Sequence, residues 1–134
     1  MENIAIIGAG ASGLFLAKLL SDRADCAVYL FEKGKNVGTK LRASGGGKAN
    51  IFNENITPSC YNQQDFMTQV LKSVQSEDVR AAFEQMGLSM VADEEGRVYP
   101  MTMFSQTVVD VLYSERYTLE LEGAARLPAS SRAT

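Results

Sequence analysis

The sequence predicts an α/β fold built on a β-α-β unit at the amino terminus. An apolar run at residues 3–7 leads into a turn whose glycines are spaced as Gly-x-Gly-x-x-Gly. Apolar residues then recur at helical spacing over residues 11–21, and a second apolar run follows at residues 26–31. The second run is almost continuously apolar, as expected for a strand that is buried on both faces of a parallel sheet.

The glycines of this turn each suit a separate task in a dinucleotide site. Gly8 allows the sharp turn, Gly10 has no side chain to hold a pyrophosphate away from the backbone, and Gly13 lets the helix lie close to the strand. The helix start offers backbone N–H groups and the positive end of its dipole. The predicted pyrophosphate-binding residues are Gly8, Gly10, Ala11, Ser12 and Gly13. A glycine-rich turn that serves packing alone is the alternative.

An acidic residue ends the second apolar run. Glu32 lies 19 positions after Gly13, where a carboxylate can accept hydrogen bonds from the hydroxyls of an adenosine ribose. The same charge repels a 2′-phosphate, so NADP(H) is a less suitable ligand than an unphosphorylated dinucleotide. Strand, turn, helix and acid together favour dinucleotide binding.

A second glycine-rich stretch lies between residues 34 and 53. Four small residues, Ser44 to Gly47, stand in a row among basic side chains, and Asn50 and Asn53 follow. Glycine loses more conformational freedom than other residues when it is ordered, so this run suits neither a helix nor a strand interior. Its backbone can approach a ligand closely, which favours ligand contact over a flexible linker.

The rest of the chain predicts helices and a hairpin. One helix is expected from about Asp65 to residue 74 and another from Ser76 to Gly87. Residues 88–91 and 97–99 have the pattern of hairpin strands, with Gly96 in the turn. A last helix is expected from Ser105, and residues 117–122 alternate like a half-buried strand. The apolar faces of the first two helices are predicted at Phe66, Val70, Leu71 and Val74, and at Val79, Phe83 and Met86.

Composition excludes several classes of function. The 134 residues leave room for one domain, and an apolar fraction of 46% is typical of a globular chain. A net charge of −3 provides no basic face for nucleic acid, and no apolar run approaches the ~20 residues of a membrane span. The amino terminus has no basic flank before its apolar run, so a cytoplasmic protein without nucleic-acid or membrane partners is expected.

The reactive side chains narrow the chemistry further. The chain has no histidine, which excludes a Ser-His-Asp triad and a histidine metal site, and no metal site is predicted. Acid–base work would have to come from Lys, Tyr, Asp or Glu. Cys26 and Cys60 form no Cys-x-x-Cys pair and are expected to be buried or incidental thiols. Arg97 is expected to pair with a neighbouring acid rather than to touch a ligand.

Several motifs together resemble the amino-terminal part of the HI0933-like flavoproteins, a group of bacterial FAD-dependent oxidoreductases. The motifs are the glycine turn, Glu32-Lys33, Gly38-x-Lys40, Ser44-Gly45-Gly46-Gly47-Lys48-Ala49-Asn50 and Gly96-Arg97-Val98-Tyr99-Pro100. The family usually has Ser-Gly-Gly-Gly-Arg-Cys-Asn in the second glycine motif, where this chain has Lys48 and Ala49. A mechanism that needs a cysteine at position 49 therefore cannot operate here.

The resemblance implies a Rossmann-like FAD-binding β-α-β core with added helices and a β-hairpin. It implies that FAD carries the hydride chemistry, with NAD(P)H as a candidate reductant and an unknown small molecule as substrate. Lys33 would then flank the adenine side, and Lys40 would lie near the phosphates or the ribitol. The residues that the resemblance assigns to the flavin side are Ser44, Gly45, Gly46, Gly47 and Asn50.

Members of this family are considerably longer than this chain. Residues 1–116 are therefore expected to be the amino-terminal part of an incomplete domain, and residues 117–134 a tail that does not match the family. The chain as given is expected to be an inactive fragment of a flavin-dependent oxidoreductase. Two alternatives stay open, an NAD(H)-binding dehydrogenase domain and a truncated, non-catalytic nucleotide-binding fragment.

Overall fold

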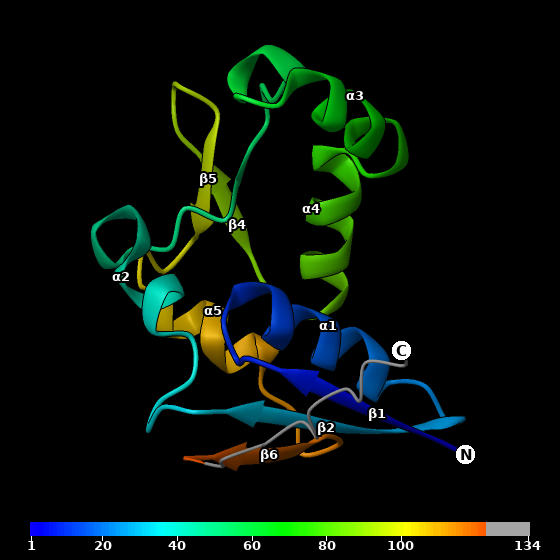
Figure 1. The fold of residues 1–134 in the computed structure, drawn as a ribbon. Coiled ribbons are helices and arrows are strands. Elements are labelled where there is room, and N and C mark those ends of the chain that lie inside the picture. The colour runs from blue at the N-terminus through cyan, green and yellow to red at the C-terminus, as the bar shows by residue number, and fades with distance from the viewer. Residues whose placement is uncertain (123–134) are drawn as a thin grey trace. The chain divides into compact units, whose positions relative to one another are not determined.

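The computed structural model describes residues 1–122 (Figure 1). The chain divides into two compact units. Over the described residues, the first unit contains residues 1–38 and 114–122, and the second unit contains residues 39–113. Each unit has a three-stranded sheet of its own.

The first unit is a parallel sheet with a helix packed on it. Its elements are β1 (Glu2–Ile7), α1 (Ala11–Ser21), β2 (Cys26–Glu32) and β6 (Thr118–Leu121). The strand order is β1-β2-β6, and both pairings are parallel. Ile6 pairs in register with Leu30, which pairs in turn with Leu119. The predicted β-α-β opening is confirmed, and the alternating segment near the carboxyl end supplies the third strand.

One face of this sheet packs against α1, which lies along it in Figure 1. Leu14 of α1 is 1% exposed, and Ile6, Val28 and Leu30 of the strands are buried with it. Close packing of these apolar side chains is what fixes the height of α1 above the strands.

The other face of the sheet is more open over the described residues. Ile7 is 57% exposed and Tyr29 is 36% exposed. Successive strand residues point to opposite faces, so α1 can cover only half of the side chains of β2. The expectation that β2 is buried on both faces is therefore wrong for the described part of the chain.

The second unit combines short helices with an antiparallel sheet. Its elements are α2 (Thr39–Gly47), β3 (Phe52–Asn53), the 3₁₀-helix η1 (Pro58–Cys60), α3 (Gln64–Ser73), α4 (Ser76–Gln85), β4 (Met90–Ala92), β5 (Arg97–Pro100) and α5 (Ser105–Leu112). The strand order is β3-β5-β4. The predicted hairpin is present, whereas the two-residue strand β3 was not predicted because so short a segment has no periodicity.

The helix α3 differs from its prediction. Its expected apolar face is largely exposed, with Phe66 66% and Val74 48% accessible, and none of its residues is buried. Its N-cap is Gln63, and Asp65, near which the helix was expected to begin, lies in its first turn. Helical spacing predicts a helix, but burial of its apolar face depends on segments that pack against it.

The next helix, α4, begins at Ser76, where the sequence predicts its start. Gln75 is the N-cap, and its N–H donates to the Asp78 carboxylate at 2.8 Å. The hydroxyl of Ser76 donates instead to the carbonyl of Asn53 at 2.9 Å, which joins α4 to β3. Phe83 is buried as predicted.

The hairpin turn between β4 and β5 requires the backbone conformation of Gly96 and contains the ion pairs of Arg97. Gly96 has a φ of +78°, a conformation that glycine adopts without strain. The Arg97 side chain lies 2.7 Å from the Asp93 carboxylate and 3.2 Å from that of Glu95. The predicted structural role of Arg97 agrees with these ion pairs.

Candidate dinucleotide site

The glycine turn, residues Gly8 to Gly13, joins β1 to α1 in the first unit. Gly8 has a φ of +100°. A Cβ on Gly13 would lie only 1.9 Å from the carbonyl oxygen of Gly8, so the close approach of α1 to β1 requires glycine there. A Cβ on Gly10 would meet no protein atom within 4 Å. The protein itself thus leaves space at Gly10, as a site for a pyrophosphate would.

The start of α1 turns amide donors toward this space. Gly10 is the N-cap in an extended conformation, and the first intrahelical bond runs from the N–H of Leu14 to the carbonyl of Gly10 at 3.0 Å. By helix geometry, the amides of Ala11, Ser12 and Gly13 have no acceptor within the helix. Ala11 and Ser12 are exposed, so their N–H groups are accessible to an anion.

Glu32 ends β2 next to the glycine turn. One carboxylate oxygen accepts the N–H of Ala9 at 2.9 Å, and the other accepts the N–H of Gly34 at 2.8 Å. The hydrogen bond from Gly34, followed by that from Ala9, holds the pKa of Glu32 below its ordinary value. An ionised carboxylate has about four acceptor positions, so two remain for the hydroxyls of a ribose. Lys33 follows it with an exposed side chain.

The second glycine stretch, Ser44 to Asn50, is termed the glycine loop and belongs to the second unit. A helical turn precedes it, but Ser44 breaks this helix with a ψ of 150°, and Gly45 and Gly46 are left-handed at φ +58° and +65°. The expectation that this run is not helical is therefore correct from Ser44 onward. The helical turn at its start, from Thr39, was not predicted.

Packing restricts one end of the glycine loop and leaves the other open. A Cβ on Gly45 would lie 2.9 Å from the Asn50 nitrogen and 3.1 Å from the ring of Tyr99. A Cβ on Gly46 or Gly47 would meet nothing within 4 Å. The glycines at 46 and 47 therefore border open space, in agreement with a backbone that a ligand can approach.

Ala49 is a feature of the glycine loop that the sequence did not predict. It is fully buried, and its φ of +59° lies in the left-handed region. Its N–H donates to the carbonyl of Ser44 at 3.0 Å, which closes the loop. No local pattern indicates this conformation, because alanine has no preference for positive φ.

The predicted site residues thus fall into two sets. The first unit brings together Gly8, Gly10, Ala11, Ser12, Gly13, Glu32 and Lys33, and the second unit contains Lys40, Ser44, Gly45, Gly46, Gly47 and Asn50. Lys40 and Asn50 are exposed. Within each unit the glycine segment is held by neighbouring backbone, as the preceding distances describe.

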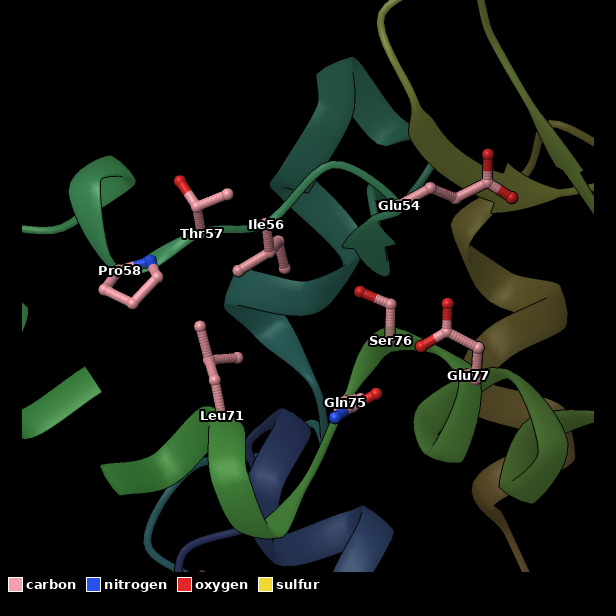
Figure 2. A pocket seen from close by; sticks show the side chains of 8 residues that line it. All are labelled: Glu54, Ile56, Thr57, Pro58, Leu71, Gln75, Ser76 and Glu77. Atoms are coloured by element: carbon pink, nitrogen blue, oxygen red, sulfur yellow. The ribbon is translucent and has the colours of Figure 1, made fainter. Parts of the chain in front are cut away.

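A separate hollow of about 330 Å³ lies in the second unit (Figure 2). Its lining residues are Glu54, Ile56, Thr57, Pro58, Leu71, Gln75, Ser76 and Glu77, none of which is a predicted site residue. Glu54 is paired with Arg80 at 2.5 Å, and Ser76 is bonded to Asn53. These polar groups have partners that stabilise the fold.

Neither metal ligation nor membrane insertion is indicated over the described residues. No cluster of His, Cys, Asp or Glu side chains in residues 1–122 could hold a metal ion. In the same part of the chain, no helix has both the length and the apolarity to cross a bilayer. Cys26 is half-buried and Cys60 is exposed, and both are free thiols.

The geometry agrees with a known family. The sequence profile of the HI0933-like protein Rossmann domain matches residues 2–129. The chain belongs to this family. The Rossmann-like α/β fold predicted from the sequence is confirmed. The family match continues past residue 116, where the matching part was expected to end, and β6 also lies beyond that residue. Residues 123–134 of the expected tail lie outside the described residues.

Three curated relatives resemble this HI0933-like chain. The 3-dehydro-bile acid delta(4,6)-reductase of Clostridium scindens is 34% identical over 119 residues, covering 86% of this chain and 29% of the relative. The ribosomal RNA dihydrouridine synthase of Haemophilus influenzae is 34% identical over 116 residues, covering 85% and 28%. The enzyme of that name from Escherichia coli is 42% identical over 60 residues, covering 45% and 15%. The chain therefore spans less than a third of the length of these relatives.

A solved structure, that of Thermovibrio ammonificans THI4, superposes with a TM-score of 0.48 at 16% identity. The superposition covers 90% of this chain and 38% of the THI4 chain.

Proposed function

We propose that this HI0933-like chain holds the FAD of a flavin-dependent oxidoreductase. The observation that carries the proposal is the open space at Gly10, bordered by the first amides of α1 and by the Glu32 carboxylate. Amide donors suit a pyrophosphate and a carboxylate suits a ribose diol, and these groups are adjacent in a dinucleotide. Family membership and the redox names of the relatives support a flavin over a nucleotide that serves no chemistry.

In this proposal, the glycine turn, Glu32 and Lys33 hold the adenosine diphosphate half of the cofactor. For the glycine loop and Lys40, the family resemblance implies contact with the flavin half. Bound FAD would supply the hydride chemistry, and the protein groups bind and orient it.

The names of the relatives suggest the reaction class. Dihydrouridine is uridine with one carbon–carbon double bond saturated, and a delta(4,6)-reductase acts on a carbon–carbon double bond as well. In uridine, and in a 3-dehydro compound with double bonds at positions 4 and 6, the double bond is conjugated with a carbonyl group. We infer that the whole protein adds a hydride and a proton across such a bond, with NAD(P)H as the reductant.

A ligand-binding experiment on the purified chain tests the cofactor assignment. FAD and ADP are titrated by calorimetry into the wild type, Gly10→Val, and Ala24→Val as a control that introduces valine at an exposed position outside the glycine turn. We expect binding to the wild type and the control, and at least a tenfold loss in Gly10→Val. Binding of NADH but not FAD would favour the dehydrogenase alternative, and binding of none of these ligands would refute the proposal.

The substrate test uses a conjugated steroid ketone and a ribosomal RNA transcript in turn. Mass spectrometry of each product, after incubation with FAD and NAD(P)H, detects the gain of two hydrogens. Reduction of the RNA would contradict the predicted absence of a nucleic-acid partner. Reduction of the steroid alone would agree with that prediction.

A further inference from the structure

Glu32 joins two turns that are far apart in the sequence. Its carboxylate bridges the N–H of Ala9, in the glycine turn, and the N–H of Gly34, which follows β2. A ribose ligand needs neither of these hydrogen bonds. The carboxylate is therefore engaged with the protein before any ligand arrives.

Three hydrogen bonds connect Ala9 and the preceding Gly8 to the segment 31–38. The N–H of the preceding Gly8 donates to Phe31, that of Gly38 donates to the Ala9 carbonyl, both at 2.7 Å, and the Ala9 N–H donates to Glu32. Ala9 is 0% exposed, so water cannot replace a lost partner without opening the turn. Of these three connections, only the one to Glu32 depends on a side chain.

We propose that Glu32 is a positioning residue that fixes the glycine turn for pyrophosphate binding, in addition to its contact with the ribose. This inference rests on the proposed function. A carboxylate suits the position because both of its oxygens accept hydrogen bonds, one toward each turn. A glutamine of the same shape offers an acceptor to one amide and directs an NH₂ donor at the other. The turn then loses a charge-assisted bond at Ala9 or at Gly34.

The test separates the ribose contact from the positioning role by removing the hydroxyls from the ligand. ADP and 2′,3′-dideoxy-ADP are titrated into the wild type, Glu32→Gln and Asp25→Asn by NMR. Asp25→Asn is the control, because Asp25 pairs with Arg23 and bonds to neither turn. If Glu32 served the ribose alone, Glu32→Gln would not change the affinity for the dideoxy ligand.

We expect Glu32→Gln to weaken both ligands by about tenfold or more, the scale of one hydrogen bond to a charged group, and Asp25→Asn to weaken neither. Weakened binding of ADP with unchanged binding of 2′,3′-dideoxy-ADP would overturn the positioning role and keep the ribose contact. Failure of the wild type to bind ADP would instead refute the proposed function.

A measurement without ligand tests the same role. In ¹H–¹⁵N spectra, the amide signals of Ala9 and Gly34 should shift in Glu32→Gln while signals of α1 beyond its first turn stay in place. A general loss of stability would not produce so local a change. In the wild type, both amides should exchange with solvent more slowly than those of Ala11 and Ser12. Rapid exchange at Ala9 and Gly34 would overturn the inference even if the variant failed to fold.

Discussion

Gly13→Ala should destabilise the fold strongly, because the backbone of Gly8 occupies the space that a side chain at position 13 needs. A Cβ there would lie 1.9 Å from the Gly8 oxygen, and real contacts of this kind stay beyond 3.0 Å, so α1 and β1 would have to separate by 3.0 − 1.9 = 1.1 Å. Overpacking of this kind costs about 1–3 kcal/mol. For a chain of 134 residues, this corresponds to a fall in Tm of roughly 4–12 °C.

Gly10→Ala provides the matched comparison in the same turn. Position 10 has a φ of −79° and open space around its Cβ, so alanine fits without a clash. Replacing glycine by alanine at an N-cap costs about 0.5–1 kcal/mol. The smaller conformational freedom of alanine in the unfolded chain offsets about 0.4–1 kcal/mol of this cost. The net change in stability should be close to zero, whereas ADP should bind more weakly.

Thermal and urea denaturation of the two variants, followed by ADP titration, measure both effects. We expect Gly13→Ala to lose stability and Gly10→Ala to lose affinity alone. A Gly13→Ala protein with the Tm of the wild type would refute the close approach of α1 to β1. A Gly10→Ala protein as unstable as Gly13→Ala would show that position 10 is constrained by the protein and not by a ligand.

Two further predictions concern stability. The folded-state pKa of Glu32 lies below its ordinary value of 4.5, so the stabilisation that Glu32 provides is present above pH 4.5 and is lost as the pH falls through the folded-state pKa. Glu32→Gln should therefore flatten the acid limb of a curve of Tm against pH. An unchanged acid limb would contradict the hydrogen bonds from the Ala9 and Gly34 amides to Glu32. Asp93→Ala should lower the free energy of unfolding measured by urea denaturation, because Asp93 accepts hydrogen bonds from the N–H groups of Glu95 and Arg97 and from the Arg97 guanidinium. The exposed neighbour Glu94 is the control, and a loss of equal size in Glu94→Ala would contradict this assignment.

Shorter ligands test the two parts of the proposed assignment separately. ADP tests the glycine turn, and FMN tests the glycine loop. A chain that binds ADP but not FMN would have a formed turn and an unformed flavin side.

The sequence by itself determined the β-α-β opening, the hairpin and the glycine turn. Each of these depends on local chemistry, because periodic apolar residues and positive φ at glycine operate within a few neighbouring positions. The roles of Gly8, Gly10 and Glu32 are predictions of the same kind, since a dinucleotide requires a fixed spacing of these residues. This spacing, together with the second glycine motif and the segment from Gly96 to Pro100, predicted the family, which the match over residues 2–129 confirms.

Only the tertiary structure decided which apolar faces are covered and what each polar group contacts. The stripe of Phe66 on α3 has helical spacing and is nevertheless exposed, because burial requires a partner from elsewhere in the chain. The bond from Ala9 to Glu32 spans 23 positions and follows from the parallel pairing of β1 with β2. A Cβ on Gly45 would lie 3.1 Å from the ring of Tyr99, which comes 54 positions later (99 − 45). Such contacts depend on chain segments distant in sequence, so no local pattern could have predicted them.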